Sequence, residues 1–273
     1  MKKHASIAVG SALCLTLSLG GVCALAAAAP DSPSSPAAGP ESDALVAQGQ
    51  QFFDSKDYEQ ALECFLEAAK GGDFDACSWI GRCYYQGKGT ETDTAEAARW
   101  FALGCVSGDA HCYTWMGKCF FHGEGVREDY EQAAKWFQLA ADDGDAYGYS
   151  QIARMLYYGW GVEQDYEKAL EYNLLAWEEG GYTYVLPMIA DAYYNGWGTD
   201  VDLEEAAKWY QVGVDADNSG LRWGSVLGLG RCYLNGEGIE QAVEKARELL
   251  EDVSENGSNT EREAAQTLLS QID

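Results

Sequence analysis

The six residues Tyr84-Tyr85-Gln86-Gly87-Lys88-Gly89 recur along the chain with both glycines in place. The four later copies are Phe120-Phe121-His122-Gly123-Glu124-Gly125, Leu156-Tyr157-Tyr158-Gly159-Trp160-Gly161, Tyr193-Tyr194-Asn195-Gly196-Trp197-Gly198 and Tyr233-Leu234-Asn235-Gly236-Glu237-Gly238. Their first glycines are 36, 36, 37 and 40 residues apart. A period of this length is typical of stacked helical hairpins, which bury their apolar faces against one another.

Each repeat reads as a helix A and a helix B joined at the G-x-G corner. Helix A carries a small residue at Gly81, Gly117, Ala153, Ala190 or Gly230, and a large apolar residue follows three positions later. Helix B pairs an alanine with an aromatic residue: Ala97 with Trp100, Ala133 with Trp136, Ala169 with Tyr172 and Ala206 with Trp209. The first glycine of each corner is expected to end helix A in the left-handed conformation.

Aspartates are predicted to cap helix B in four repeats, at Asp93, Asp129, Asp165 and Asp202. Glu96, Gln132 and Glu205 follow three positions later as expected capping-box partners, and Asp57 with Gln60 repeats the pattern near the start. No aspartate follows the fifth corner, so that repeat is degenerate. Pro187 falls within the fourth helix A and is expected to kink or delay it.

The first 41 residues are not expected to belong to the fold. Residues 1–29 combine a basic start, an uncharged run and a final alanine-rich stretch, which is typical of a secretory signal peptide. The alternatives are an uncleaved membrane anchor and a lipid anchor on Cys23. Residues 30–41 are rich in Pro, Ser and Ala and are predicted to be a disordered linker. The protein is therefore expected to be exported, to the periplasm or the medium, or to stay membrane-anchored.

The remaining residues, 42–273, are predicted to form one all-α domain. Its expected parts are a first hairpin (42–72), repeats at about 73–108, 109–144, 145–180 and 181–217, a degenerate repeat (218–256) and a C-terminal cap (257–273).

The repeat resembles that of the Sel1-like family, a relative of the tetratricopeptide repeat. The shared motif is LG-x-x-Y-x-x-G-x-G-V, then D-x-x-x-A-x-x-W/Y, then A-x-x-x-G, and Met116–Gly144 is its best copy. The resemblance implies a right-handed α-solenoid. It also implies an adaptor, because known relatives mostly act in signalling, secretion, exopolysaccharide export and host contact.

Composition and motifs favour a binding protein over an enzyme or a nucleic-acid partner. The net charge is −26, which would repel a phosphate backbone. His111 and His122 are too far apart along one helix to share a metal, and no nucleophilic triad is recognisable, so we expect no catalytic residue, metal or cofactor. Asp215–Gly220 resembles the start of a calcium loop but has Val226 where the loop needs a glutamate, which favours a solvated turn.

Seven cysteines lie beyond the signal. Cys83, Cys119 and Cys232 share one helix A position, which favours a buried apolar role. Cys105 ends a helix B and Cys112 begins the next helix A. If the protein is exported they are candidates for a disulfide, and a cysteine-rich branch of the family is bridged at nearly this position.

Tetratricopeptide geometry would place the residue after the small helix A position on the concave face. In four of five repeats this residue is basic, and aromatic residues follow it. The predicted ligand-binding set is Arg82, Tyr85, Lys118, Phe121, His122, Arg154, Tyr157, Tyr158, Tyr194 and Arg231. It suits an acidic peptide, although the alternative is that the cations pair with nearby glutamates and the rings form inter-repeat core.

Trp160 and Trp197 stand in the middle of two corners and are predicted to contact a protein or glycan at the edge, or to pack on a neighbouring hairpin. The sequence thus predicts an exported, non-enzymatic scaffold that binds a peptide or protein on its concave face. The alternatives are a scaffold for polysaccharide export or cell-wall assembly, and a weak β-lactamase-like hydrolase as in cysteine-rich relatives.

Overall fold

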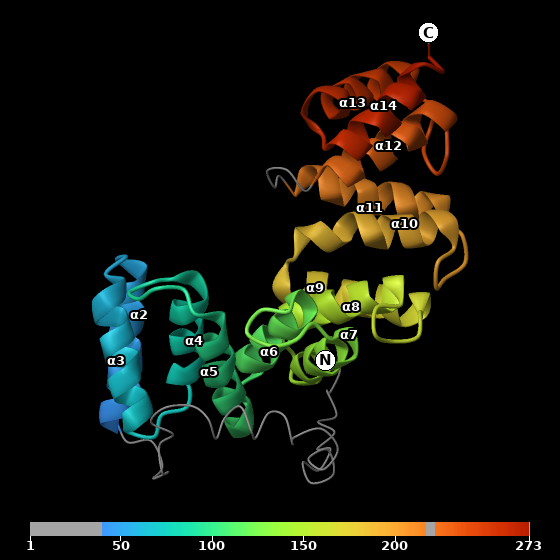
Figure 1. Ribbon diagram of the computed structural model, residues 1–273. Coiled ribbons are helices and arrows are strands. Elements are labelled where there is room, and N and C mark those ends of the chain that lie inside the picture. The colour runs from blue at the N-terminus through green and yellow to red at the C-terminus, as the bar shows by residue number, and fades with distance from the viewer. Residues whose placement is uncertain (1–39, 217–221, 273) are drawn as a thin grey trace, which may run out of the picture. The chain divides into compact units, whose positions relative to one another are not determined.

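The computed structural model describes residues 40–216 and 222–272, and all regular elements in these ranges are helices (Figure 1). The chain divides between Glu128 and Asp129 into two compact units, which are described separately below. The predicted signal peptide and nearly all of the predicted linker lie outside the described residues. So do residues 217–220 of the loop that resembles a calcium site.

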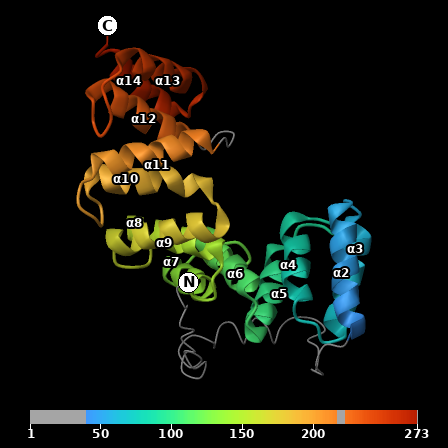
Figure 2. The ribbon, with the colours of Figure 1, turned by 180° about the vertical axis from the view of Figure 1, so that it is seen from behind.

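The described residues of unit 1 form five helices that pack in sequence order. They are α2 (Pro40–Asp54), α3 (Tyr58–Lys70), α4 (Ala76–Gln86), α5 (Thr94–Ser107) and α6 (Ala110–His122). The helices α2 and α3 form one hairpin and α4 and α5 the next, while α6 packs on α5 and α4 (Figures 1 and 2). The predicted helical hairpins are therefore confirmed here.

Unit 2 continues the same plan. Its elements are α7 (Tyr130–Asp142), α8 (Ala146–Tyr158), α9 (Tyr166–Gly180), a 3-10 turn η1 (Thr183–Val185), α10 (Leu186–Asn195), α11 (Leu203–Asp215), α12 (Trp223–Asn235), α13 (Val243–Asn256) and α14 (Asn259–Leu269). The hairpins are α8 with α9, α10 with α11, and α12 with α13, and α14 covers α13 as a last helix.

The two glycines of each corner have different structural roles. The first one, Gly87 in the first corner, ends helix A with φ near +66°, as predicted. The second has positive φ as well, and it lies against the backbone of the preceding hairpin. A Cβ placed on Gly125 would be 2.0 Å from the Thr94 carbonyl oxygen, and one on Gly238 would be 1.8 Å from that of Leu203. Only glycine permits this approach between backbones.

The predicted aspartate caps of helix B are confirmed in four repeats. The Asp93 carboxylate accepts a hydrogen bond from the Glu96 backbone N–H at 2.9 Å, and Asp129, Asp165 and Asp202 act alike. The prediction for Asp57 is wrong, because its side chain makes no cap bond. A two-residue turn with Lys56 at φ 67° precedes it, so Asp57 enters α3 without the extended backbone of the other caps.

The expected capping boxes are replaced by ion pairs at two positions. Glu96 pairs with Arg99 at 2.9 Å and Glu205 with Lys208 at 2.9 Å, one turn further along their helices. A complete capping box forms instead at Ser258 and Glu261, where α14 begins.

Small residues of helix A receive the rings of helix B. A Cβ on Gly49 would lie 2.5 Å from the Phe65 ring, and one on Gly81 would lie 2.3 Å from the Phe101 ring. Both rings are fully buried. The sequence pattern pointed to Trp100 as the aromatic residue of this helix B. The ring that packs on Gly81 is instead that of the next residue, Phe101, which helix B turns toward the helix A of the same hairpin.

Pro187 delays its helix, as predicted. A 3-10 turn occupies Thr183–Val185, and α10 starts at Leu186 with the proline in its first turn, where a missing backbone N–H costs nothing.

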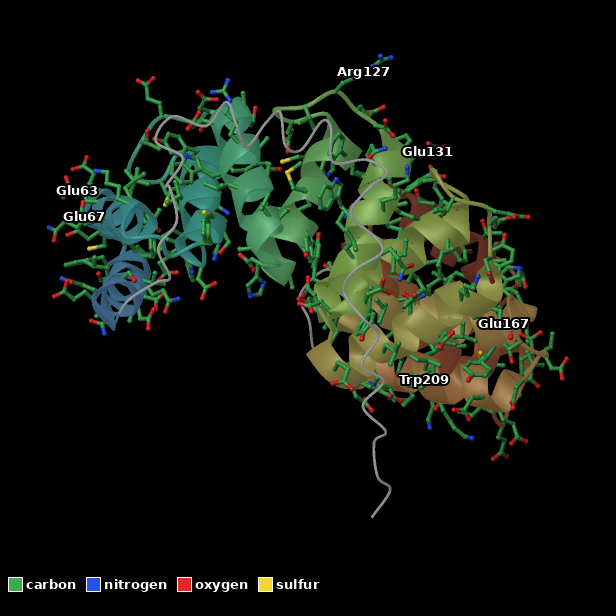
Figure 3. The ribbon with its side chains drawn as sticks, turned by 90° about the horizontal axis from the view of Figure 1, so that it is seen from below. Glu63, Glu67, Arg127, Glu131, Glu167 and Trp209 are labelled. Atoms are coloured by element: carbon green, nitrogen blue, oxygen red, sulfur yellow. The ribbon has the colours of Figure 1, made fainter. Side chains whose placement is uncertain are left out.

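Acidic side chains are exposed on the surface of the B helices. Glu63 and Glu67 of α3 are exposed in unit 1, and Glu131 of α7 and Glu167 of α9 are exposed in unit 2 (Figure 3). They account for part of the large negative charge without entering the core.

Candidate functional site

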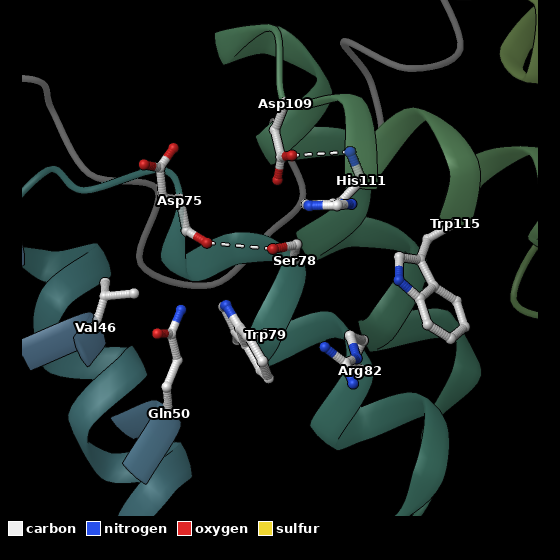
Figure 4. A pocket seen from close by; sticks show the side chains of 9 residues that line it. All are labelled: Val46, Gln50, Asp75, Ser78, Trp79, Arg82, Asp109, His111 and Trp115. Atoms are coloured by element: carbon white, nitrogen blue, oxygen red, sulfur yellow. Dashed lines mark hydrogen bonds between the residues drawn. The ribbon is translucent and has the colours of Figure 1, made fainter. Parts of the chain in front are cut away.

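A cavity of about 450 Å³ opens among the A-type helices of unit 1. Its walls come from α2, α4 and α6, which correspond to the helix A positions of successive repeats (Figure 4). The lining residues are Val46, Gln50, Asp75, Ser78, Trp79, Arg82, Asp109, His111 and Trp115. We call this cavity the unit 1 pocket.

Arg82 is the predicted site residue that lines this pocket. Its guanidinium carbon lies 4.4 Å from the centroid of the Trp79 ring and 5.3 Å from that of Phe53. Its buried Nε has no hydrogen-bond partner in the described part of the chain, and no ion pair to the group is found there. Partial burial lowers the pKa of Arg82 from its usual value. The group therefore has donors available to a ligand.

Two tryptophans of the pocket are held in equivalent ways. The Trp79 ring stacks on Phe65 with centroids 5.4 Å apart, and the Trp115 ring stacks on Phe101 at 5.3 Å. A cationic side chain one turn further along the same helix lies over each indole ring. Arg82 lies over Trp79, and Lys118 Nζ lies 4.3 Å from the centroid of the Trp115 ring. These contacts fix the indoles as rigid walls.

The other end of the pocket is acidic. Asp109 accepts hydrogen bonds from the His111 backbone N–H at 2.9 Å and from Cys112 Sγ at 3.1 Å, which orient its carboxylate. Asp75 stands where α4 begins, and its backbone N–H donates to Asp73. Within the described residues no side chain pairs with the Asp75 carboxylate. Asp75 and Asp109 therefore give this end a negative potential.

The remaining predicted residues of unit 1 are less open to a ligand. The Tyr85 hydroxyl donates to Glu124 of the next corner, and its ring meets Trp115 edge-on at 5.1 Å. Phe121 is half-buried and touches His122, which is exposed and does not line the pocket. Tyr85 thus serves the contact between repeats, which was the alternative left open by the sequence.

In unit 2 the predicted cations lie against aromatic rings. Arg231 lies 3.7 Å from the Tyr194 centroid, donates to the Tyr210 hydroxyl at 3.0 Å and approaches Asp191 at 4.0 Å. Arg154 lies 5.9 Å from the Trp160 ring. Tyr194 in turn donates to Glu237 at 2.5 Å.

The two corner tryptophans pack on tyrosines of unit 2. Trp197 lies between Tyr157 at 5.5 Å and Tyr166 at 5.8 Å, both from the preceding hairpin. Trp160 stacks on Tyr158 at 4.5 Å and on Tyr130 at 6.3 Å. Their contact with a partner stays a prediction.

The cysteines of unit 1 are thiols in the structure, so the predicted bridge between Cys105 and Cys112 is not formed there. Burial raises the pKa of both thiols well above the usual value, with Asp109 adding to the effect. Cys83, Cys119 and Cys232 are fully buried, which confirms their predicted apolar role.

Most of the pocket was missed from the sequence. Trp79 precedes Arg82 by three residues, as Trp115 precedes Lys118, so both tryptophans share a helix face with a predicted residue. That spacing was the available signal. His111, for which the sequence predicted no metal or catalytic role, is exposed and lines the pocket. The contribution of Val46 and Gln50 depends on how α2 packs, which no local pattern reveals.

Two absences hold for residues 40–216 and 222–272. No cluster of three or more His, Cys, Asp or Glu side chains is arranged to hold a metal. None of the helices in these ranges is long and apolar enough to cross a membrane.

Successive A and B helices joined at glycine corners define a helical-repeat protein. The family model described as "Sel1 repeat" matches residues 47–73, 74–109, 110–145, 146–180, 188–218 and 225–258. The chain therefore belongs to the Sel1 repeat family, whose helical scaffolds typically mediate protein interactions.

Solved structures of similar proteins agree with this fold. A Sel1 repeat protein from Oxalobacter formigenes is 24% identical, with a TM-score of 0.71 over 79% of this chain and 86% of that one. A protective antigen of uropathogenic Escherichia coli strains, described as displaying an SLR fold, is 25% identical, with a TM-score of 0.73 over 94% of this chain. The chain spans 52% of that antigen. No curated protein sequence matches the chain.

Proposed function

We propose that this protein is a non-catalytic scaffold that holds a peptide, or an extended segment of a partner protein, in the unit 1 pocket. The observation that carries the proposal is a cavity of about 450 Å³ with two braced indoles and an arginine that forms no ion pair in the described chain. Aromatic and arginine side chains are the residues that dominate protein interfaces. Rigid walls also reduce the entropy lost on binding.

The proposed place of action is outside the cytoplasm. Support comes from residues 1–29, which have the charge and hydrophobic pattern of an export signal. Fractionation of cells that express the full chain tests this. Recovery in the cytoplasm with an intact N-terminus would contradict it.

Selection from a random peptide library on the purified full chain tests the binding function. We expect peptides whose affinity falls at least tenfold in Arg82→Ala. Arg99→Ala is the matched control, because Arg99 lies in the same repeat but pairs with Glu96 on helix α5. The proposal fails if no peptide is selected, or if Arg82→Ala binds as the wild type does. Turnover of nitrocefin by the purified chain would contradict the non-catalytic assignment.

A second candidate function is glycan binding in unit 2. The observation in its favour is the stacked pair of Tyr158 and Trp160, in which Tyr158 is 52% exposed. Glycan arrays probed with wild type and Tyr158→Ala distinguish this function from peptide binding, which Tyr158→Ala should leave unchanged.

A further inference from the structure

The unit 1 pocket has opposite charges at its two ends. Asp75 and Arg82 stand on the same helix, seven residues apart, which corresponds to two helical turns and about 10 Å along the axis. Both line the cavity, and Trp79 lies between them (Figure 4). Asp109 and His111 of α6 lie at the same end as Asp75. The pocket is therefore dipolar as well as aromatic.

The two charges remain available to a ligand. Asp109 is committed to capping α6, but Asp75 makes no side-chain cap bond and has no partner side chain in the described residues. Arg82 contacts rings and forms no ion pair there, with the exposed Asp54 acting on it only at longer range. No ion pair joins Asp75 and Arg82 in the described residues, and their backbone positions are about 10 Å apart along the helix axis. The acidic peptide expected from the sequence would satisfy only the Arg82 end.

A particular peptide geometry matches this spacing. In a polyproline II helix, residues i and i+3 lie on the same side and are about 9 Å apart, since each residue rises about 3.1 Å and three complete a turn. Grooves walled by aromatic rings are the usual receptors for this conformation. In a β-strand, by contrast, residues i and i+3 point to opposite faces.

We infer that the unit 1 pocket recognises a basic-x-x-acidic segment in the polyproline II conformation. The basic side chain lies at Asp75 and Asp109, the acidic one accepts from the Arg82 guanidinium, and the two intervening residues pack on Trp79 and Trp115. This inference rests on the proposed function and specifies its ligand class.

The experiment measures binding of labelled peptides to the full chain by fluorescence anisotropy. The host peptide is proline-rich, and its four central residues are Lys-Pro-Pro-Glu, Lys-Pro-Pro-Lys or Glu-Pro-Pro-Glu. We expect the mixed-charge peptide to bind at least tenfold more tightly than either peptide of a single charge sign. A polyproline II peptide can bind in either chain direction, so the reversed order Glu-Pro-Pro-Lys is expected to bind as well.

Charge reversals then test each end of the pocket. Asp75→Lys should shift the preference to Glu-Pro-Pro-Glu, and Arg82→Glu should shift it to Lys-Pro-Pro-Lys. The double variant Asp75→Lys with Arg82→Glu restores a dipole of opposite direction and should regain the mixed-charge preference. Each single variant that binds its newly preferred peptide is shown by that binding to be folded. Glu63→Lys is the control, because Glu63 is exposed on α3 and the charge change is the same.

The outcomes separate the two proposals. If library peptides bind but neither reversal changes the charge preference, the dipolar inference is wrong and the scaffold function stands. Equal affinity for all three peptides contradicts the inference in the same way. If neither designed nor selected peptides bind, the proposed function fails, and the inference fails with it.

Discussion

The same helix A position has opposite roles in the two units. In unit 1, Arg82 lies over Trp79 beside a cavity and forms no ion pair in the described chain. In unit 2, Arg231 is surrounded by Tyr194, the Tyr210 hydroxyl and Asp191. The difference follows from the residue at the same helix A position of the preceding repeat. For Arg231 this residue is Asp191, and for Arg82 it is Gln50. A repeat position therefore does not define a role until the adjacent repeat is known.

What the two units share is the corner. The aromatic residue near the end of one helix A meets the middle residue of the next corner, and the chemistry varies. Tyr85 donates to Glu124 and Tyr194 to Glu237, whereas Tyr157 packs on Trp197 and Phe53 on Lys88. The geometry of the contact is kept while its side chains change.

The largest expected effect tests that shared corner. Gly125→Ala in unit 1 and Gly238→Ala in unit 2 would drive a methyl group into a backbone carbonyl at positive φ, so each should lower the free energy of unfolding by about 3 kcal/mol or more. Gly144→Ala is the control: its φ is 85° but nothing lies within 4 Å, so about 1–2 kcal/mol is expected. Urea denaturation measures all three. A marked difference between the Gly125 and Gly238 variants would mean that the corners are not equivalent.

An intermediate effect tests the contrast between the arginines. Arg231→Ala removes a charged hydrogen bond and leaves Asp191 without its cation, so we expect a loss of about 2 kcal/mol in unfolding free energy. Arg82→Ala removes only ring contacts and should cost less than about 1 kcal/mol. Thermal and urea unfolding report both values. Equal losses would show that Arg82 is as structural as Arg231.

The smallest effect is a pH dependence in unit 2. Burial raises the pKa of Asp191 above its usual value, and the Tyr210 hydroxyl and Arg231 oppose this only in part. A raised pKa in the folded state favours the protonated form, so its stabilising contribution is complete below about pH 4 and is lost as the pH rises through the raised pKa.

Asp191→Asn, which stays uncharged, should therefore gain stability relative to the wild type at pH 7 and show no gain at pH 3. The gain is small, because 43% of the Asp191 side chain is exposed. Urea midpoints at the two pH values measure it, and a gain at pH 3 equal to that at pH 7 would exclude this titration as the cause.

The sequence predicted the elements of the fold far better than the site. Glycine spacing and aspartate caps are local signals, so the helices and corners followed from them. The failure at Asp57 came from a turn of different length, with Lys56 in the left-handed region, which the cap pattern does not report. Arg82 was found from its repeat position. The acidic end of the pocket was missed, because Asp75 and Asp109 belong to different helices and meet only after α4 and α6 have packed.

The second glycine of each corner has one more implication. Since main chain lies against main chain there, this part of the spacing between neighbouring hairpins does not depend on which side chains are present. Ligand-facing residues can then differ between repeats without a change in this backbone contact. One whole repeat can therefore be exchanged for another. A chimaera that receives a foreign repeat cut at its glycine corners should keep its register and acquire that repeat's specificity.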